Sequence, residues 1–189
     1  MIGRLAPKTA NTVPANDEWA NRIQKTLDEI AQAHKETEKA HKETEKALGR
    51  LSNRLGDMAE YTLLPNLPEK FKKFDFTFQV INRNRKIADD EHGIHAEIDA
   101  FLENSNQAMA VEVKLTLKPE DVDEHVKRME KIRQYADLHN DKRQFFGAIA
   151  AAVIDEDANR YTLTQGFYII EPSGEDVKII PPVSKPKVW

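Results

Sequence analysis

The sequence predicts an α/β fold in which helices flank a mixed central sheet and a long coiled-coil helix precedes the sheet. Three patterns predict it: a seven-residue repeat over residues 17–52, a period-two hairpin over residues 94–115, and a helical stripe over residues 119–139. A continuous apolar run follows the stripe, as in a buried strand reached through a crossover helix. The expected order is helix, three strands, helix and strand, then a second helix and strand.

Composition limits the classes of protein to which the chain can belong. Its 189 residues carry a net charge of −4, which argues against a strongly basic coat for nucleic acid. No cysteine is present, so disulfides and thiolate zinc sites are excluded. Residues 1–16 lack the apolar run of a signal peptide, and the longest apolar run, residues 145–154, is shorter than the roughly 20 residues that cross a membrane. We expect a cytoplasmic protein whose residues 1–16 are a disordered lead.

A heptad repeat organises the first helix, which we expect to begin at Asn16 or Asp17 and to form a coiled coil over residues 17–52. The segment AHKETEK occurs twice in tandem, at residues 33–39 and 40–46. The two seam positions hold Ala20, Leu27, His34, His41, Leu48 and Leu55, and Ile23, Ile30, Thr37, Thr44, Leu51 and Met58. An amphipathic helix of this kind needs a partner that buries its seam, so we expect self-association. The alternative is a solvated helix held by Glu–Lys pairs, because the middle of the seam is polar.

The second domain is expected to cover residues 53–180, with an extended tail over residues 181–189. The long helix continues to about residue 64, where prolines end it. Residues 74–81, FDFTFQVI, alternate aromatic and β-forming residues and predict the first strand. The basic stretch that follows offers contacts to a phosphate backbone through Arg83, Arg85 and Lys86. The alternative for this stretch is a solvated loop.

The hairpin over residues 94–115 has a self-consistent register. Folding it about Ser105 and Asn106 pairs Leu102 with Met109, Ala100 with Val111 and Ile98 with Val113. The even-numbered residues of the first strand are then expected to share one apolar face, from residue 94 to residue 102.

The same register sets Asp99 opposite Glu112 and Glu97 opposite Lys114. Like charges that face each other across a sheet are destabilising. A hard divalent cation would supply the missing counter-charge, because Mg²⁺ binds one or two carboxylates and keeps several waters. Lys114 follows Glu112 by two residues and therefore points to the same side, where it can align a water or a phosphate. In the alternative interpretation, Glu97–Lys114 and Glu112–Lys114 are surface ion pairs, which leaves Asp99 against Glu112 unexplained.

The rest of the chain completes the order of elements. Pro119 followed by two acids starts a helix that runs to about residue 139. Residues 145–154 predict a buried strand, and residues 157–165 a short helix. Residues 167–170 and 176–180 predict the last two strands.

The arrangement of E-I-D on one strand and E-V-K on the next resembles the PD-(D/E)XK nuclease superfamily, with its restriction-endonuclease-like fold. The matching residues are Asp99 for the Asp, and Glu112, Val113 and Lys114 for E-x-K; Ile98 stands where the motif has Pro. The resemblance covers about residues 50–172. The layout also resembles prokaryotic nuclease-like families in which a heptad-rich segment precedes this core.

The resemblance implies a nuclease that uses Mg²⁺ or Mn²⁺ to cleave DNA. Asp99, Glu112 and the carbonyl of Val113 would hold the metal, and Glu60 of the first core helix would be a further ligand. Lys114 would position water or stabilise charge on the phosphate. Gln134 matches a polar residue that the family often carries on its second core helix near the metal site, and it is a further candidate for contact with nucleic acid; the alternative is a surface glutamine. The alternative is an inactive nuclease fold that acts as an oligomeric scaffold or as a nucleic-acid-binding module.

Overall fold

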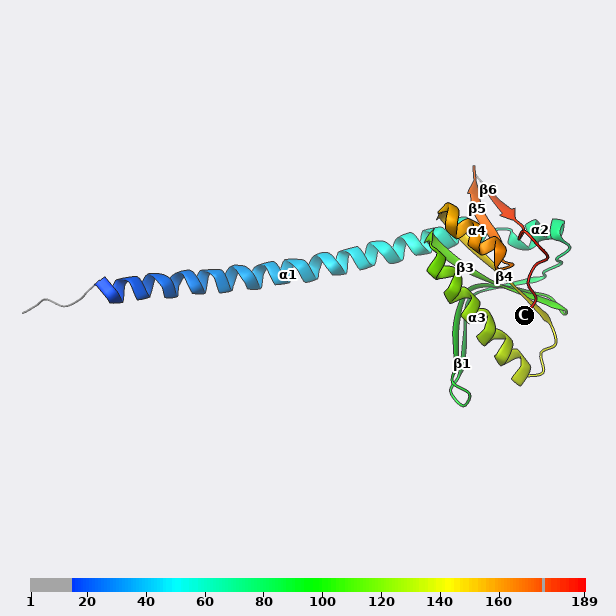
Figure 1. Ribbon diagram of the computed structural model, residues 1–189, viewed down its shortest axis with the longest axis horizontal. Helices are drawn as coiled ribbons and strands as arrows, with labels where there is room; N and C mark the ends of the chain where they lie inside the picture. Colours follow the sequence, from blue (N-terminus) through cyan, green and yellow to red (C-terminus); the bar gives the residue numbers. More distant parts are fainter. Residues whose placement is uncertain (1–14, 175) are drawn as a thin grey trace, which may run out of the picture. The chain divides into compact units, whose positions relative to one another are not determined.

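The computed structural model describes residues 15–174 and 176–189 (Figure 1). The predicted disordered lead lies outside these residues, except for its last two. Helix α1, Ala15–Leu63, begins before the expected cap and ends close to the expected residue 64. The chain divides into two units, of which the first ends at Leu51 and the second begins at Ser52, so α1 contributes to both. We refer to them as the N-terminal unit and the C-terminal unit.

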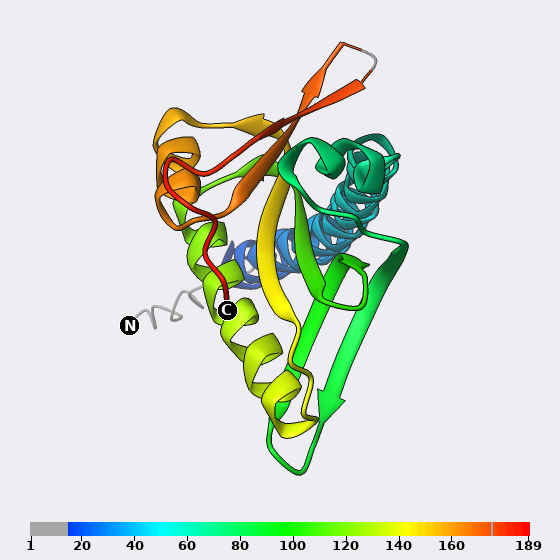
Figure 2. The ribbon, with the colours of Figure 1, turned by 90° about the vertical axis from the view of Figure 1, so that its right-hand side faces the viewer.

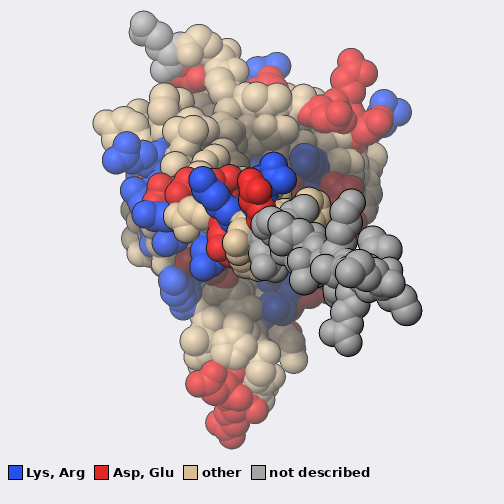
Figure 3. All heavy atoms as spheres, turned by 90° about the vertical axis from the view of Figure 1, so that its left-hand side faces the viewer, with Lys and Arg blue, Asp and Glu red and all other residues tan. Residues whose placement is uncertain are grey.

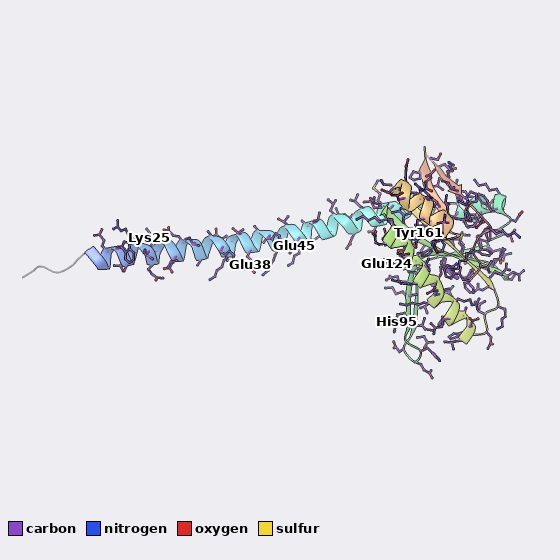
Figure 4. All side chains as sticks on the ribbon, viewed as in Figure 1. Lys25, Glu38, Glu45, His95, Glu124 and Tyr161 are labelled. Atoms are coloured by element: carbon purple, nitrogen blue, oxygen red, sulfur yellow. The ribbon has the colours of Figure 1, made fainter. Side chains whose placement is uncertain are left out.

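The described part of the N-terminal unit consists of residues 15–51 of helix α1. Every side chain from Glu18 to Leu51 is exposed, and Figure 4 labels Lys25, Glu38 and Glu45 along this helix. Ion pairs one turn apart stabilise it, with 2.8 Å between Lys42 Nζ and Glu38 Oε1. The seam residues Thr37 and Thr44 donate their hydroxyls to carbonyls of the preceding turn at 2.9 and 2.8 Å. The polar middle of the seam therefore satisfies its own hydroxyls within the helix.

The C-terminal unit is a six-stranded mixed sheet with helices on both faces. Its elements after α1 are α2 (Leu67–Phe71), a 3₁₀ turn η1 (Lys72–Phe74), β1 (Val80–Asp89), β2 (Ile94–Glu103), β3 (Gln107–Leu117), α3 (Pro119–Leu138), β4 (Gln144–Ile154), α4 (Glu156–Thr164), β5 (Tyr168–Ser173) and β6 (Asp176–Ile180). The spatial order of the strands follows the sequence, β1-β2-β3-β4-β5-β6. Strand β4 runs parallel to β3 and β5, and the other neighbours are antiparallel.

Helices lie on both faces of this sheet (Figure 2), and a hydrophobic core lies under the helices of each face. The end of α1 and α2 cover the first core, in which Leu63, Leu67 and Phe71 are fully buried. Helices α3 and α4 cover the second core, to which they contribute Met129 and Ala158. Because β4 lies between two parallel neighbours and under helices on both sides, its residues 145–151 are buried without interruption. The predicted mixed sheet flanked by helices is confirmed.

The prediction of a strand over residues 74–81 is wrong. The 3₁₀ turn and an irregular segment occupy most of this stretch, and β1 begins only at Val80. The aromatic side chains pack together: the rings of Phe76 and Phe78 stack 5.1 Å apart, and Phe76 lies 5.7 Å from the ring of Tyr168. Buried aromatic residues therefore alternate with exposed residues as in a strand, although the irregular segment forms no strand. The basic stretch that follows is therefore the edge strand β1 rather than a loop.

The central hairpin forms as predicted at its turn and over the four residue pairs nearest to the turn. Leu102 pairs with Met109 and Ala100 with Val111. The turn is held by Asn104, whose Oδ1 accepts from the backbone N–H groups of Asn106 and Gln107 at 2.8 and 2.7 Å. Pairing of β2 with β3 ends at Ala100, so the expected pairs beyond it do not form: Asp99 with Glu112, Ile98 with Val113, and Glu97 with Lys114.

The crossover helices begin as their sequences predict. Helix α3 has Pro119 in its first turn, and Asp121 Oδ2 accepts from the backbone N–H of Lys118 at 2.9 Å. Helix α4 is capped by Asp155, which accepts from the N–H of Asp157 at 2.8 Å. The C-terminal residues 181–189 return to the sheet, where the Trp189 N–H donates to the Phe145 carbonyl at 3.0 Å. Among the helices of the described residues, none has the length and apolarity needed to cross a membrane.

Candidate functional site

The candidate site lies where the β2–β3 ladder ends. One residue before the last pair, Asp99 Oδ2 accepts a hydrogen bond from the backbone N–H of Val113 at 2.7 Å. The side chain of Asp99 therefore occupies the place that a carbonyl of β2 would hold in a continued ladder. The carboxylate keeps its second oxygen free of that bond, and the two strands no longer pair beyond this point.

Both strands of the β1–β2 ribbon change faces at the level of Asp99. Ile98 belongs to the core under α3, whereas Ala100 belongs to the core under α1 and α2. In β1, Ile81 packs against the first core and Ile87 lies in the second, although both have odd numbers. Asn84, between them, has a left-handed backbone conformation with a φ of 51°. The expected single apolar face from residue 94 to residue 102 is therefore wrong, because the strand twists over at the site.

Glu112 is a buried carboxylate with two cationic neighbours. Its side chain is 7% exposed, and Oε1 lies 3.2 Å from Lys114 Nζ. Arg128 of α3 donates to the other oxygen, Oε2. Burial raises the pKa of Glu112 above its usual value, and the negative charge of Asp99 raises it further, against the opposing effects of Arg128 and Lys114. The carboxylates of Asp99 and Glu112 therefore repel each other near the end of the β2–β3 ladder.

Lys114 is held between two carboxylates rather than opposite Glu97. Its Nζ lies 3.2 Å from Glu112 Oε1 and 3.3 Å from Asp121 Oδ1, at the first turn of α3. Burial lowers the pKa of Lys114, but Glu112 and Asp121 outweigh this effect and the net shift is upward. Lys114 therefore stays cationic at neutral pH. Glu97 forms its ion pair with Lys86 at 3.1 Å instead, so the expected facing of Glu97 and Lys114 is wrong.

Glu60, near the end of α1, is also affected by the charge of Asp99. Partial burial raises its pKa, and the charges of Asp99 and Asp57 raise it further, while Arg83 of β1 lowers it. The negative charge of Asp99, on β2, thus raises the pKa of both Glu60 and Glu112. Glu60, Asp99 and Glu112 therefore interact electrostatically, and Lys114 contacts Glu112.

Arg128 and His125 are the residues of this region that the sequence analysis did not single out. Arg128 NH1 also lies 3.3 Å from His125 Nδ1, and the His125 side chain is fully buried. Burial, together with the charge of Arg128, lowers the pKa of His125 to about 3, so its ring is neutral. Helical spacing could have indicated that His125 is buried, because it follows buried Val122 by three residues and precedes buried Met129 by four.

The predicted phosphate contacts have different surroundings. Arg83 is exposed, and its charge acts on Glu60. Arg85 pairs with Glu103 at 3.4 Å and lies over the ring of Phe101, with 4.3 Å from its Cζ to the ring centroid. Lys86 is in the surface pair with Glu97, and Gln134 is exposed on α3. Arg83 and Gln134 are therefore accessible, whereas Arg85 has a structural partner.

An open groove of about 290 Å³ lies between β2 and α3, beside the site. It is lined by His95, Ala96, Glu97, Glu124, Lys127, Arg128 and Lys131, and Figure 4 labels His95 and Glu124 in this region. The groove thus has three cations and two carboxylates. By contrast, the β1–β2 turn carries Asp89, Asp90 and Glu91, and Figure 3 shows acidic side chains at the lower end of the C-terminal unit.

The donor chemistry of the site fits a hard divalent cation, although the ligands do not converge on one point. Four carboxylates, Glu60, Asp99, Glu112 and Asp121, outnumber the cations Arg83, Lys114 and Arg128 by one. Oxygen donors of this kind are those that Mg²⁺ prefers. Within residues 15–174 and 176–189, no three His, Asp or Glu side chains are grouped closely enough to ligate a metal. Glu112 is instead neutralised by Arg128 and Lys114.

No protein family model, curated protein or solved structure matches this chain. The function is therefore argued from the geometry of the site.

Proposed function

We propose that the protein is a Mg²⁺- or Mn²⁺-dependent nuclease that hydrolyses phosphodiester bonds of DNA. The observation that carries this proposal is the end of the β2–β3 ladder, where Asp99 leaves the backbone pairing and acts electrostatically on both Glu60 and Glu112. Carboxylates that repel one another in a partly buried site need a cation, and perturbed pKa values of this kind cluster at functional sites.

The order of elements supports a restriction-endonuclease-like core. After α1 and the short elements α2 and η1 come the antiparallel strands β1, β2 and β3, then α3 and the parallel strand β4. This is the helix–strand–strand–strand–helix–strand order that the resemblance to PD-(D/E)XK nucleases implies. Asp99 on β2, Glu112 and Lys114 on β3 and Glu60 on α1 occupy the corresponding elements.

Asp99 and Glu112, with Glu60 and the Val113 carbonyl, would hold the divalent cation. When bound there, the cation activates water and offsets the charge of the phosphate. Asp99 is fixed by the Val113 N–H, which orients its carboxylate before any ligand arrives. Lys114, charged and held by Glu112 and Asp121, presents a positive group to the charge that develops on the phosphate.

A second candidate function is a nuclease fold without catalysis, used as an oligomeric scaffold or as a nucleic-acid-binding module. The observation in its favour is that Arg128 and Lys114 neutralise Glu112 within the protein itself. In this case the carboxylates would be a structural ion-pair network, and basic residues such as Arg83 and Lys127 would bind backbone phosphates without cleavage.

Mg²⁺ titration separates the two candidates. We expect Asp99→Asn to weaken Mg²⁺ binding at least about tenfold and to abolish plasmid cleavage, because the variant removes a ligand charge but keeps an oxygen for the Val113 N–H. Binding is measured by calorimetry and cleavage on the same samples. Glu97→Gln, on the same strand and exposed, is the matched control and should change neither. Wild-type protein that binds no Mg²⁺ at millimolar concentration would exclude the nuclease and favour the scaffold.

We also propose that the protein self-associates through the heptad seam of α1. Leu27, Ile30 and Leu48 are 53, 59 and 65% exposed, and they lie on the seam. Exposed ion pairs one turn apart stabilise a helix by only about 0.3–0.5 kcal/mol each. A helix with this exposed apolar stripe is better stabilised by a second copy that buries the stripe.

Ile30→Glu is therefore expected to convert the oligomer to monomer, because the variant places a charge in the apolar seam. Sedimentation velocity of the full chain at about 10–100 µM measures the change. Lys39→Glu alters charge off the seam and should leave the oligomer intact. A monomeric wild-type protein over this concentration range would contradict self-association.

A further inference from the structure

Arg128 stands between the buried carboxylate of Glu112 and the open groove. Its NH1 donates to Glu112 Oε2, and its side chain is 21% exposed while that of Glu112 is 7% exposed. The same side chain lines the groove next to Lys127. Arg128 thus contacts the buried carboxylate of Glu112 and also lines the groove.

The buried ring of His125 contacts the guanidinium of Arg128 and helps to hold it in place. An arginine side chain has donors and no acceptor, so His125 Nδ1, 3.3 Å away, accepts from Arg128 NH1. The proton of the neutral ring is then on Nε2, a buried atom, and a hydrogen bond with the backbone of Ala110 also acts on the ring. The ring lies against Phe167, with 4.9 Å between the ring centroids, which limits its movement. Arg128 is therefore held on Glu112 by a rigid neighbour.

Both oxygens of Glu112 are engaged in this arrangement, Oε1 by Lys114 and Oε2 by Arg128. A divalent cation that binds Glu112 needs at least one of these oxygens, and it would be repelled by a guanidinium that remains there. Lys114 is tied additionally to Asp121, whereas the outer side of Arg128 faces the groove. The groove therefore gives Arg128 space into which it can withdraw.

We propose that Arg128 is the resident counter-ion of Glu112, and that a divalent cation binds this site by displacing it. The inference rests on the proposed function, because it assumes that Glu112 ligates the cation. It adds that the affinity for the cation is set by competition with a residue of α3. The carboxylate therefore does not remain buried without a counter-charge before the cation binds.

The competition is measured by Mg²⁺ calorimetry on wild type, Arg128→Gln and Lys127→Gln. We expect Arg128→Gln to bind Mg²⁺ about tenfold more tightly, within the range usual for coupled binding events. Lys127→Gln removes a neighbouring charge from the same groove but no partner of Glu112, and it should stay within about twofold of wild type. Equal or weaker Mg²⁺ affinity in Arg128→Gln would overturn the inference.

A second measurement uses wild-type protein and does not depend on the folding of a variant. The guanidinium N–H signals of Arg128, followed by ¹⁵N NMR and assigned with Arg128→Lys, should lose their protection from solvent exchange as Mg²⁺ saturates the site. Signals that stay protected at saturation would overturn the inference while Mg²⁺ binding, and with it the proposed function, stands. If neither wild type nor Arg128→Gln binds Mg²⁺, both are overturned.

Discussion

Replacing Lys114 with Met is expected to lower the rate of DNA cleavage by about 10²–10³-fold without weakening Mg²⁺ binding. This is the usual cost of removing one preorganised group that stabilises developing charge. Met has a similar length and removes only the positive charge. Since Lys114 shares Glu112 with the proposed cation, its loss should leave Mg²⁺ affinity unchanged or higher.

The position of Lys114 supports this separation of rate from binding. Two carboxylates hold its ammonium at 3.2 and 3.3 Å, and together they outweigh burial and raise its pKa. Since the group stays charged and oriented, it needs little rearrangement when negative charge develops on a phosphate. A flexible surface lysine would lack this preorganisation.

Single-turnover cleavage at saturating Mg²⁺ measures the effect, and calorimetry measures the affinity. Lys118→Met is the control, because Lys118 is exposed just after β3 and its backbone, not its ammonium, contacts Asp121. The control should change the rate by less than about threefold, as expected for a surface substitution. Unchanged cleavage in Lys114→Met would exclude its assigned role.

The second large effect expected concerns His125 and acid stability. Between pH 7 and pH 5, His125 should lower the free energy of unfolding by about 2 kcal/mol, and by about 4 kcal/mol in total by pH 3. The reason is that burial, followed by the charge of Arg128, lowers its pKa from 6.5 to about 3 in the folded protein. Unfolded chains take up this proton below pH 6.5, whereas the folded protein does not. Stability is therefore lost as the pH falls.

Urea unfolding at pH 7 and pH 5 tests this expectation when wild type is compared with His125→Gln. The glutamine keeps an oxygen that accepts from Arg128 but cannot be protonated in this range. The loss of stability between the two pH values should be smaller in this variant by about 2 kcal/mol. His95→Gln, at an exposed histidine, should retain the wild-type difference. Equal differences in all three proteins would show that His125 is protonated in the folded state.

Local sequence patterns were sufficient for the central hairpin and the crossover helices. Alternation and the Asn104 turn determine the register from Leu102 to Ala100, because one face must be apolar and a slip of one residue would reverse it. Proline and acids at the start of α3 satisfy free backbone groups within a few residues. The same patterns failed at residues 74–81, where packing among aromatic rings replaced strand pairing.

What the sequence by itself determined is the order of the elements and the presence of Asp99, Glu112 and Lys114 on adjacent strands. Their spacing is local, and local spacing is set by backbone periodicity. Only the tertiary structure decided that the ladder ends before Asp99, that Asp121 rather than Glu97 holds Lys114, and that Arg128 neutralises Glu112. These contacts join β3 to α3. They depend on how the helix packs over the sheet, which no periodicity along the chain encodes.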